Sequence, residues 1–351
     1  MSDQSAPPTR DPSSKLAHIE ACLDDDVEYR KSAGFERFEF IHEALPELSL
    51  DAIDTSLSLR SRELGAPLMV APMTGGVERG RDLNRKLAAM AQRHRLAMGL
   101  GSLRLAIEDP SRAELFRVRD VAPDILLFAN VGAGQLSRGW GPEQCLQAVQ
   151  VVDADHLLIH LNPLQEAVQK GDVDFSGLLE KIQEVAEVLA AEGITVGVRE
   201  VGFGLSAATA RRLIDAGITL LDCAGAGGTS WAKVEARVAS DPRTRRLGEA
   251  FGEWGIPTAD SVRAVRAVSD HVDIIATGGL RSGLDLAKAI ALGADLGAMA
   301  RPFLLAAERG DEELDTFVTS VIDELRLAMF CLGAPDLEAL HRSPHLVERA
   351  R

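Results

Sequence analysis

Aromatic side chains are scarce in this chain, at 4% of its 351 residues, with a single tyrosine. The apolar fraction is nevertheless 46%, so a large core must be built from aliphatic side chains. Basic residues are outnumbered, with 38 Lys and Arg against 53 Asp and Glu and a formal net charge of -15. This balance argues against a nucleic-acid partner or an anionic-membrane surface, and it requires any anionic ligand to bind in a focused pocket.

Cysteine pairs and long apolar runs are also missing. The four cysteines lie far apart and form no C-x-x-C motif, so buried reduced thiols are predicted rather than a zinc knuckle or a disulfide framework. No apolar run reaches membrane-spanning length, and the first eight residues hold no signal-peptide core. We therefore expect a cytoplasmic protein with no membrane partner.

The pattern of apolar runs predicts three regions. Residues 1–14 are rich in Ser, Pro and Asp and are predicted to be a disordered tail. Residues 15–63 are predicted to form an N-terminal helix and strand extension, and residues 64–351 the main domain. In the main domain, eight short apolar runs alternate with helical patterns over about 240 residues, which is typical of an α/β fold of the (β/α)₈ TIM barrel type. The predicted strands are Leu68–Ala71, Leu96–Leu100, Ile125–Ala129, Leu157–His160, Thr195–Arg199, Leu220–Cys223, Ile274–Ala276 and Leu296–Ala300.

An extra polar segment, residues 231–255, follows the sixth predicted strand. An insertion of this length after a barrel strand is either a lid over the site or a disordered loop. The sequence leaves both possibilities open.

The loops after the predicted strands are rich in glycine, which lets backbone N–H groups approach a flat or phosphorylated ligand. Gly278 and Gly279 follow the seventh strand, and Arg301 follows the eighth. Barrels commonly bind a phosphate at this point, and a helix N-terminus near Ser282 would assist. Tight strand–helix turns would need the same glycines, but Arg301 favours a phosphate.

Arg199 closes the fifth predicted strand and is followed by Glu200. A cation at the barrel mouth would stabilise a ring that gains negative charge on reduction, which is how proteins tune a flavin. The alternative is an ion pair between these two neighbours.

Four polar residues lie within seven positions at the end of the fourth predicted strand: His160, Asn162, Gln165 and Glu166. Glu166 could hold Mg²⁺, which prefers carboxylate and substrate-phosphate oxygens. Asn162 and Gln165 can orient a substrate, and His160 can supply a proton or a hydrogen bond. Together they predict a functional site rather than a core histidine.

Lys15 and His18 lie one turn apart on the first predicted helix, on one face. They could reach an anion over the barrel mouth, although the sequence by itself favours a solvated surface.

In combination these motifs resemble the type 2, flavin-dependent isopentenyl-diphosphate isomerases, from about Leu16 to the C-terminal helix. The matching motifs are Met73–Gly76, His160–Glu166, Ala224–Trp231 and Gly278–Gly279. The resemblance implies a barrel that binds FMN and Mg²⁺ and interconverts isopentenyl and dimethylallyl diphosphate with no net redox change. It further implies FMN reduction by NADPH, an isoprenoid diphosphate substrate, and assembly as a homotetramer or homo-octamer.

The resemblance also implies roles for single residues. Gln165, His160 and Arg199 would be catalytic, and Glu166 would bind the metal ion. The diphosphate and its carbon chain would be surrounded by Lys15, His18, Ser102, Arg104, His160, Asn162 and Gln165. FMN would be held by Met73, Thr74, Gly75, Ser102, Asn130, Arg199, Thr229, Gly278, Gly279, Ala300 and Arg301.

Two positions depart from the family pattern. Ser14 stands where the family usually has Arg before the residue that matches Lys15, and Arg199 stands where it usually has Lys. Arg keeps the charge but changes the donor geometry. Two other functions stay open: an FMN barrel that oxidises a 2-hydroxy acid, and a divergent flavin-binding paralogue with weakened or altered prenyl-diphosphate activity.

Overall fold

The computed structural model describes residues 12–341 and 343–349. At its centre, eight parallel strands form a closed barrel, with β11 pairing back to β4. Each barrel strand overlaps one of the eight predicted runs, so the predicted (β/α)₈ fold is confirmed. The strands are β4 (Leu68–Val70), β5 (Ala97–Gly99), β6 (Leu127–Gly132), β7 (His156–His160), β8 (Val196–Arg199), β9 (Leu220–Asp222), β10 (Asp273–Thr277) and β11 (Leu296–Met299).

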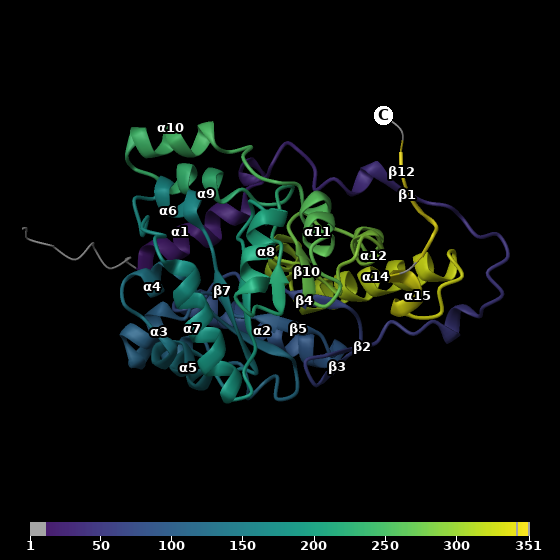
Figure 1. Cartoon of the computed structure of the whole chain (residues 1–351), viewed down its shortest axis with the longest axis horizontal. Helices are drawn as coiled ribbons and strands as arrows, with labels where there is room; N and C mark the ends of the chain where they lie inside the picture. The colour runs from purple at the N-terminus through teal and green to yellow at the C-terminus, as the bar shows by residue number, and fades with distance from the viewer. Residues whose placement is uncertain (1–11, 342, 350–351) are drawn as a thin grey trace, which may run out of the picture.

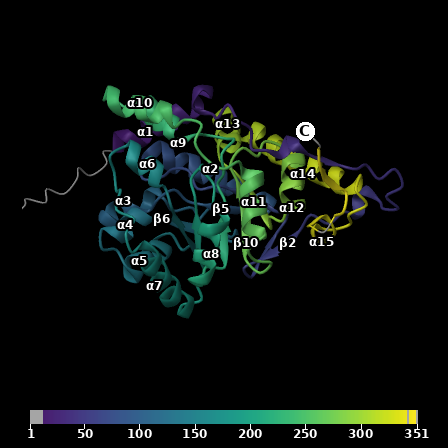
Figure 2. The same cartoon turned by 45° about the horizontal axis from the view of Figure 1, so that its top comes forward.

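Helices surround this barrel (Figures 1 and 2). They form because their apolar residues recur every three or four positions, as in α2, which buries Leu83, Leu87 and Met90 on one face. The longer helices are α2 (Glu78–His94), α5 (Pro142–Val151), α7 (Leu178–Ala191), α8 (Ala207–Asp215), α11 (Thr258–Arg266), α12 (Gly283–Ala291), α13 (Arg301–Arg309) and α14 (Asp311–Phe330). The short helices are α3 (Arg104–Glu108), α4 (Ala133–Ser137), α6 (Pro163–Val168) and α15 (Leu337–His341).

The barrel interior is packed with aliphatic side chains and one phenylalanine, Phe128. A hairpin of β2 (Leu57–Leu59) and β3 (Arg62–Leu64) adds Leu59 and Leu64 to this cluster. Arg60 in the hairpin turn pairs with Asp273, the first residue of β10, so the hairpin covers the end of the barrel where the strands begin. The opposite end, where the strands finish, remains for ligands.

His156 begins β7 at the covered end and is 8% exposed, and its Nδ1 accepts a hydrogen bond from Thr195 N at 3.1 Å. Burial lowers the pKa of His156 below its usual range. The unfolded chain binds a proton near pH 6.5 that the folded protein does not bind, so the free energy of unfolding falls as the pH drops through that value. We expect His156→Gln to lose less Tm than the wild type between about pH 7 and 5.5. An equal loss in both would contradict this, and His271→Gln, at an exposed position, is the control.

The N-terminal extension packs on two sides of the barrel. Helix α1 (Pro12–Leu23) begins inside the stretch predicted as a tail, of which residues 1–11 lie outside the described part of the chain. Strand β1 (Phe38–Phe40) pairs antiparallel with β12 (Leu346–Glu348) near the C-terminus. The extension therefore also pairs with a strand near the C-terminus of the chain.

The segment 231–255 is mostly helical and is not a disordered loop. It forms α9 (Trp231–Val238) and α10 (Pro242–Ala250), which contact each other, while α9 also contacts α1 and α6. Figures 1 and 2 show these four helices gathered at one end of the molecule. In the described part of the chain, no helix has the length and apolar character needed to cross a membrane.

Candidate active site

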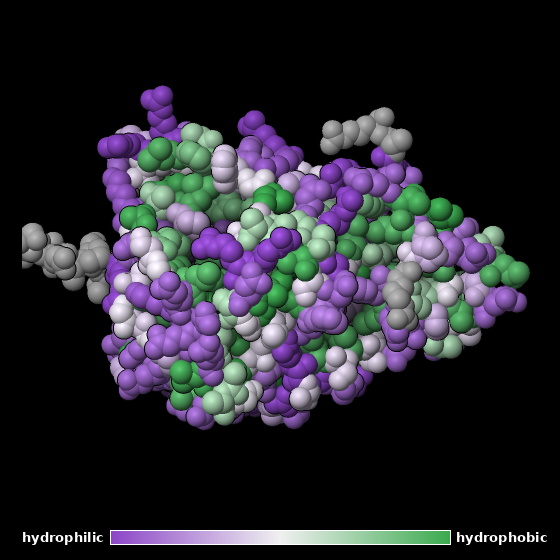
Figure 3. Space-filling view, viewed as in Figure 1, coloured by the Kyte–Doolittle hydropathy of each residue, from purple (hydrophilic) through white to green (hydrophobic). Residues whose placement is uncertain are grey.

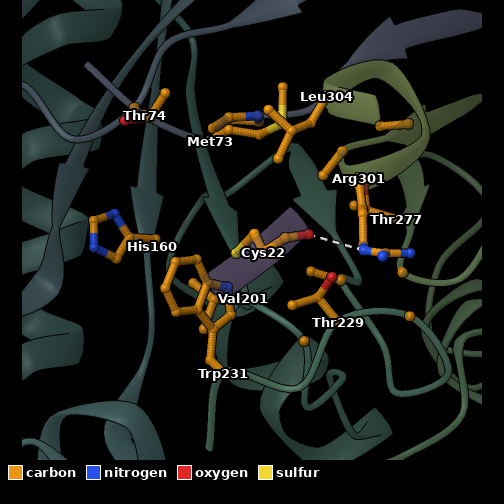
Figure 4. Close-up of a pocket in the computed structure, with 18 of the residues that line it drawn as sticks. Cys22, Met73, Thr74, His160, Val201, Thr229, Trp231, Thr277, Arg301 and Leu304 are labelled. Carbon is orange, nitrogen blue, oxygen red and sulfur yellow. Dashed lines mark hydrogen bonds between the residues drawn. The ribbon is translucent and has the colours of Figure 1, made fainter. Parts of the chain in front are cut away.

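One large cavity opens at the end of the barrel where the strands finish, bounded by the strand-end loops and by residues of α1, α9 and α13 (Figure 4). It brings together most of the predicted site residues. Gly75 and Glu166 lie beside the cavity rather than on its wall. The predicted residues on the wall are Lys15, His18, Met73, Thr74, Ser102, Arg104, Asn130, His160, Asn162, Gln165, Arg199, Thr229, Gly278, Gly279, Ala300 and Arg301.

The polar residues after β7 are held in fixed orientations. His160 Nδ1 lies 2.8 Å from Asn130 Oδ1 on the neighbouring strand β6, within hydrogen-bonding distance. Asn162 Nδ2 donates to Gln165 Oε1 at 3.1 Å and to Glu166 Oε1 at 2.9 Å. Asn162, Gln165 and Glu166 are all buried. A buried network of this kind holds its members in one arrangement.

Glu235, on α9, completes this network, and the sequence interpretation missed it. Its carboxylate accepts a hydrogen bond from Gln165 Nε2 at 2.8 Å and lies 3.4 Å from His18 Nε2. Glu235 is only 4% exposed, and the apolar residues on either side of it, Val234 and Ala236, are buried as well. An acidic residue one turn after Trp231, within an otherwise apolar helix face, was the signal that could have identified it.

Glu166 can contribute to a magnesium site only if a bound substrate supplies further oxygen ligands. Its two carboxylate oxygens accept hydrogen bonds from Asn162 and from Asp172 N, the latter at 2.7 Å. Within residues 12–341 and 343–349, no cluster of three or more His, Cys, Asp or Glu could hold a metal ion. Mg²⁺ commonly binds through one or two carboxylates together with substrate phosphates, so Glu166 is suited to that arrangement.

Arg199 pairs with Asp222 at the end of β9, and not with its neighbour Glu200. Arg199 Nε donates to Asp222 Oδ2 at 2.9 Å, and both residues are buried. Burial raises the pKa of Asp222, which the cation of Arg199 opposes. Glu200 instead accepts hydrogen bonds from the N–H groups of residues 201–203, and burial raises its pKa to about 7.

The glycines after β9 and β10 bring two loops into direct contact. Gly278 has a φ of 105°, and a Cβ there would lie 2.1 Å from Gly225 O. A Cβ on Gly228 would lie 2.6 Å from Gly279 N. The cavity wall at this point is therefore bare backbone, which fits the phosphate and the flat ring of a flavin mononucleotide.

Two backbone N–H groups at the helix N-terminus near Ser282, which the sequence predicts to assist a phosphate site, donate to side chains. Gly283 N donates to Glu324 Oε2 at 2.6 Å and Asp285 N to Ser282 Oγ at 3.1 Å, so other side chains already occupy these groups. Helix α13, one of the helices that border the cavity, has no side-chain cap at its N-terminus.

Lys15 and His18 lie in the cavity and not on the solvated surface that the sequence favoured. Lys15 Nζ donates to Gly75 O at 2.7 Å and lies 5.2 Å from the centre of the Phe116 ring. The ring of His18 meets that of Trp231 edge-on, with 5.6 Å between centroids. Ser14 belongs to α1, but its side chain lies outside the described residues.

Comparison with known proteins agrees with this geometry. Residues 178–348 match a family model described as FMN-dependent dehydrogenase. Among solved structures, a flavocytochrome b2 mutant superposes with a TM-score of 0.66 at 15% identity, over 94% of this chain and 82% of the other. A mandelate oxidase mutant gives 0.61 at 17% identity, over 95% and 92%. At these identities the structural matches show the fold alone. The fold and the glycine-lined cavity thus define a (β/α)₈ barrel of the FMN-binding class.

Sequence relatives narrow this class. A Synechococcus protein named isopentenyl-diphosphate delta-isomerase is 51% identical over 94% of this chain and 95% of its own. Relatives of the same name from Nostoc and Rickettsia bellii are 47% and 45% identical, over 95% and 94% of this chain and 95% and 96% of their own. The chain belongs to the isopentenyl-diphosphate delta-isomerase family. This confirms the resemblance and does not favour a 2-hydroxy-acid oxidase or a divergent paralogue.

Gly278→Ala tests the backbone wall of the cavity. The added Cβ meets Gly225 O and also requires a left-handed backbone, so we expect FMN affinity to fall at least about tenfold. Titration of FMN fluorescence quenching measures this. Gly139→Ala is the matched control, because Gly139 also has a positive φ, 97°, but no heavy atom within 4 Å of its added Cβ. Equal affinities of the two variants would contradict the predicted role of close packing.

Proposed function

We propose that the protein interconverts isopentenyl and dimethylallyl diphosphate, with reduced FMN and Mg²⁺ bound in the barrel mouth. One observation carries the proposal. The polar residues after β7 and the bare glycine backbone after β9 and β10 line the same cavity. An anionic substrate and a flavin can therefore face each other across a single space.

The basic side chains of the cavity suit a diphosphate. Lys15, His18 and Arg104 line it together with Ser102, although the protein as a whole is acidic. A charged ligand is drawn to such a concave basic site despite an unfavourable net charge. Glu166, next to Asn162, would hold Mg²⁺ against the phosphate oxygens.

Isomerisation adds one proton at the terminal alkene carbon and removes another from the allylic carbon, so electrons and atoms balance. Reduced FMN, when bound, would supply the acid–base chemistry at these carbons. The chain excludes water with Met73, Val201, Trp231 and Leu304, which line the cavity (Figure 4). Gln165, fixed by Asn162 and Glu235, presents its amide at the cavity wall.

The direct test is anaerobic incubation of the purified protein with isopentenyl diphosphate, FMN, NADPH and Mg²⁺. We expect dimethylallyl diphosphate, with loss of activity when Mg²⁺ is chelated. FMN-loaded and fully reduced protein that forms no product would refute the proposal. Replacing NADPH with dithionite separates a failure of flavin reduction from a failure of isomerisation.

The assembly and location also remain proposals. We propose a homotetramer or homo-octamer in the cytoplasm, as the resemblance implies. Exposed apolar side chains in the 231–255 segment, Leu247, Phe251 and Trp254, support assembly, since Trp254 is 62% exposed. Figure 3 shows apolar surface over α9 and α10. Light scattering measures the assembly, and a monomer would contradict the proposal.

A further inference from the structure

Arg301 joins the N-terminal helix α1 to the barrel. Its Nε donates to Cys22 O at 2.9 Å, the bond drawn in Figure 4, and its Nη2 donates to Leu23 O at 3.4 Å. Its Nη1 donates to Glu28 Oε1 at 3.0 Å. One barrel residue thus contacts both the last turn of α1 and the segment that follows it.

The chemistry of helix ends explains the first two contacts. The last carbonyl groups of a helix have no partner within the helix and carry partial negative charge, which a cation stabilises. Arg301 is the first residue of α13, where the N-terminal partial charge is positive and a cation is unfavourable. The position of Arg301 is therefore explained by groups outside its own helix. Its side chain is only 11% exposed, so these contacts are poorly screened by water.

Glu28 extends the connection to a second arginine. The same Oε1 lies 3.0 Å from Arg281 Nη2, in the loop after β10. The backbone around Glu28 is fixed to the loop after β9, because Tyr29 N donates to Gly228 O at 2.9 Å and Ser230 N donates to Val27 O at 2.8 Å. The backbone of residues 27–29 is therefore held against the barrel loop, and the Glu28 carboxylate bonds to Arg301 from this position.

Apolar packing also joins α1 to α9. The apolar cluster between them has Ala21, Val27 and Val234 at its centre, with Trp231 and Val238 packed against them. Helix α1 carries Lys15 and His18 to the cavity wall. The position of these two basic side chains therefore depends in part on what holds the end of α1.

We propose that Arg301 is a positioning residue, which together with Glu28 clasps α1 over the cavity so that Lys15 and His18 face the bound substrate. This role is additional to any contact of Arg301 with the FMN phosphate. The effect on substrate rests on the proposed function. The effect on α1 does not, because it can be measured on protein that turns nothing over.

The test uses the full-length, FMN-loaded protein with Arg301→Met, Arg301→Lys and Glu28→Gln, and with Arg309→Met as the control. Arg309 ends the same helix and is exposed. Hydrogen–deuterium exchange of the α1 amides is the primary measurement. We expect exchange to rise roughly tenfold or more in Arg301→Met, less in Glu28→Gln and Arg301→Lys, and not at all in Arg309→Met.

Steady-state kinetics and FMN titration complete the test. KM for isopentenyl diphosphate should rise several-fold in Arg301→Met, while kcat changes less. Unchanged α1 exchange with FMN affinity lowered about tenfold would overturn the proposal and leave Arg301 as a phosphate ligand only. If Arg301→Met does not fold, Glu28→Gln decides, since unchanged α1 exchange in that variant also overturns the proposal. A wild-type protein without isomerase activity would refute the proposed function but leave the exchange result interpretable.

Discussion

Asp222→Ala should lower the free energy of unfolding by about 3 to 5 kcal/mol, because it leaves a buried cation without its partner. Arg199 is 6% exposed and Asp222 is fully buried, so water replaces the lost carboxylate poorly. The change also removes the acceptor for Ala224 N, which donates to Asp222 Oδ1 at 3.1 Å. Urea unfolding of the flavin-free protein measures the effect without contributions from ligand binding.

A double variant separates the charge from the packing. Arg199→Met combined with Asp222→Leu removes both charges, and most of the lost stability should return. Glu313→Ala is the control for an exposed ion pair, since Glu313 faces Arg309 on the surface, and it should cost less than about 1 kcal/mol. If the free energy of unfolding of Asp222→Ala stays within about 1 kcal/mol of the wild type, the prediction is wrong, and water in the cavity must solvate Arg199 in place of the carboxylate.

The barrel could be predicted from the sequence because its strands are buried on both faces. A run such as Leu157–Ile159 is apolar at every position, and eight short, largely apolar runs alternate with amphipathic helices. The residues at the ends of these runs could also be assigned to one site. Strands of a parallel barrel all finish at the same end, so His160 and Gly278 had to lie on the same side.

Partners between distant segments could not be predicted in the same way. Arg199 has an acidic neighbour in sequence, but strand register places Asp222 directly beside it on β9. Likewise, Ser282 precedes a helix in which Asp285 N donates to the Ser282 hydroxyl and Gly283 N donates to Glu324 of α14. Which polar groups become partners depends on which elements pack together. The periodicity of the sequence shows only that a face is buried.

The surroundings of α1 illustrate the same limit. Its sequence places Lys15 and His18 on one face, which suits a solvated helix as well as a bound anion. The position of α1 is determined by α9, whose Trp231 and Glu235 contact His18, and by Arg301, which contacts the end of α1. These contacts join three segments that are far apart in the chain, so no local pattern could show them.

Gln165→Met should lower isomerase turnover on the order of 100-fold while leaving FMN affinity within about twofold of the wild type. Met keeps most of the side-chain volume but has no amide, so the group fixed between Asn162 and Glu235 is lost. The glycine wall that suits FMN lies on other strands and is unchanged. Single-turnover assays with pre-reduced enzyme measure the chemical step directly.

A second glutamine gives the matched control for this prediction. Gln169 caps the end of the same helix, α6, and does not line the cavity, so Gln169→Met should keep turnover within about twofold. Glu235→Gln then tests how the amide is held. The new side chain can still accept the bond from Gln165, so it should retain more activity than Glu235→Leu, which cannot. Equal turnover in Gln165→Met and Gln169→Met would remove Gln165 from the reaction, and with it the reason for burying Glu235 beside the substrate cavity.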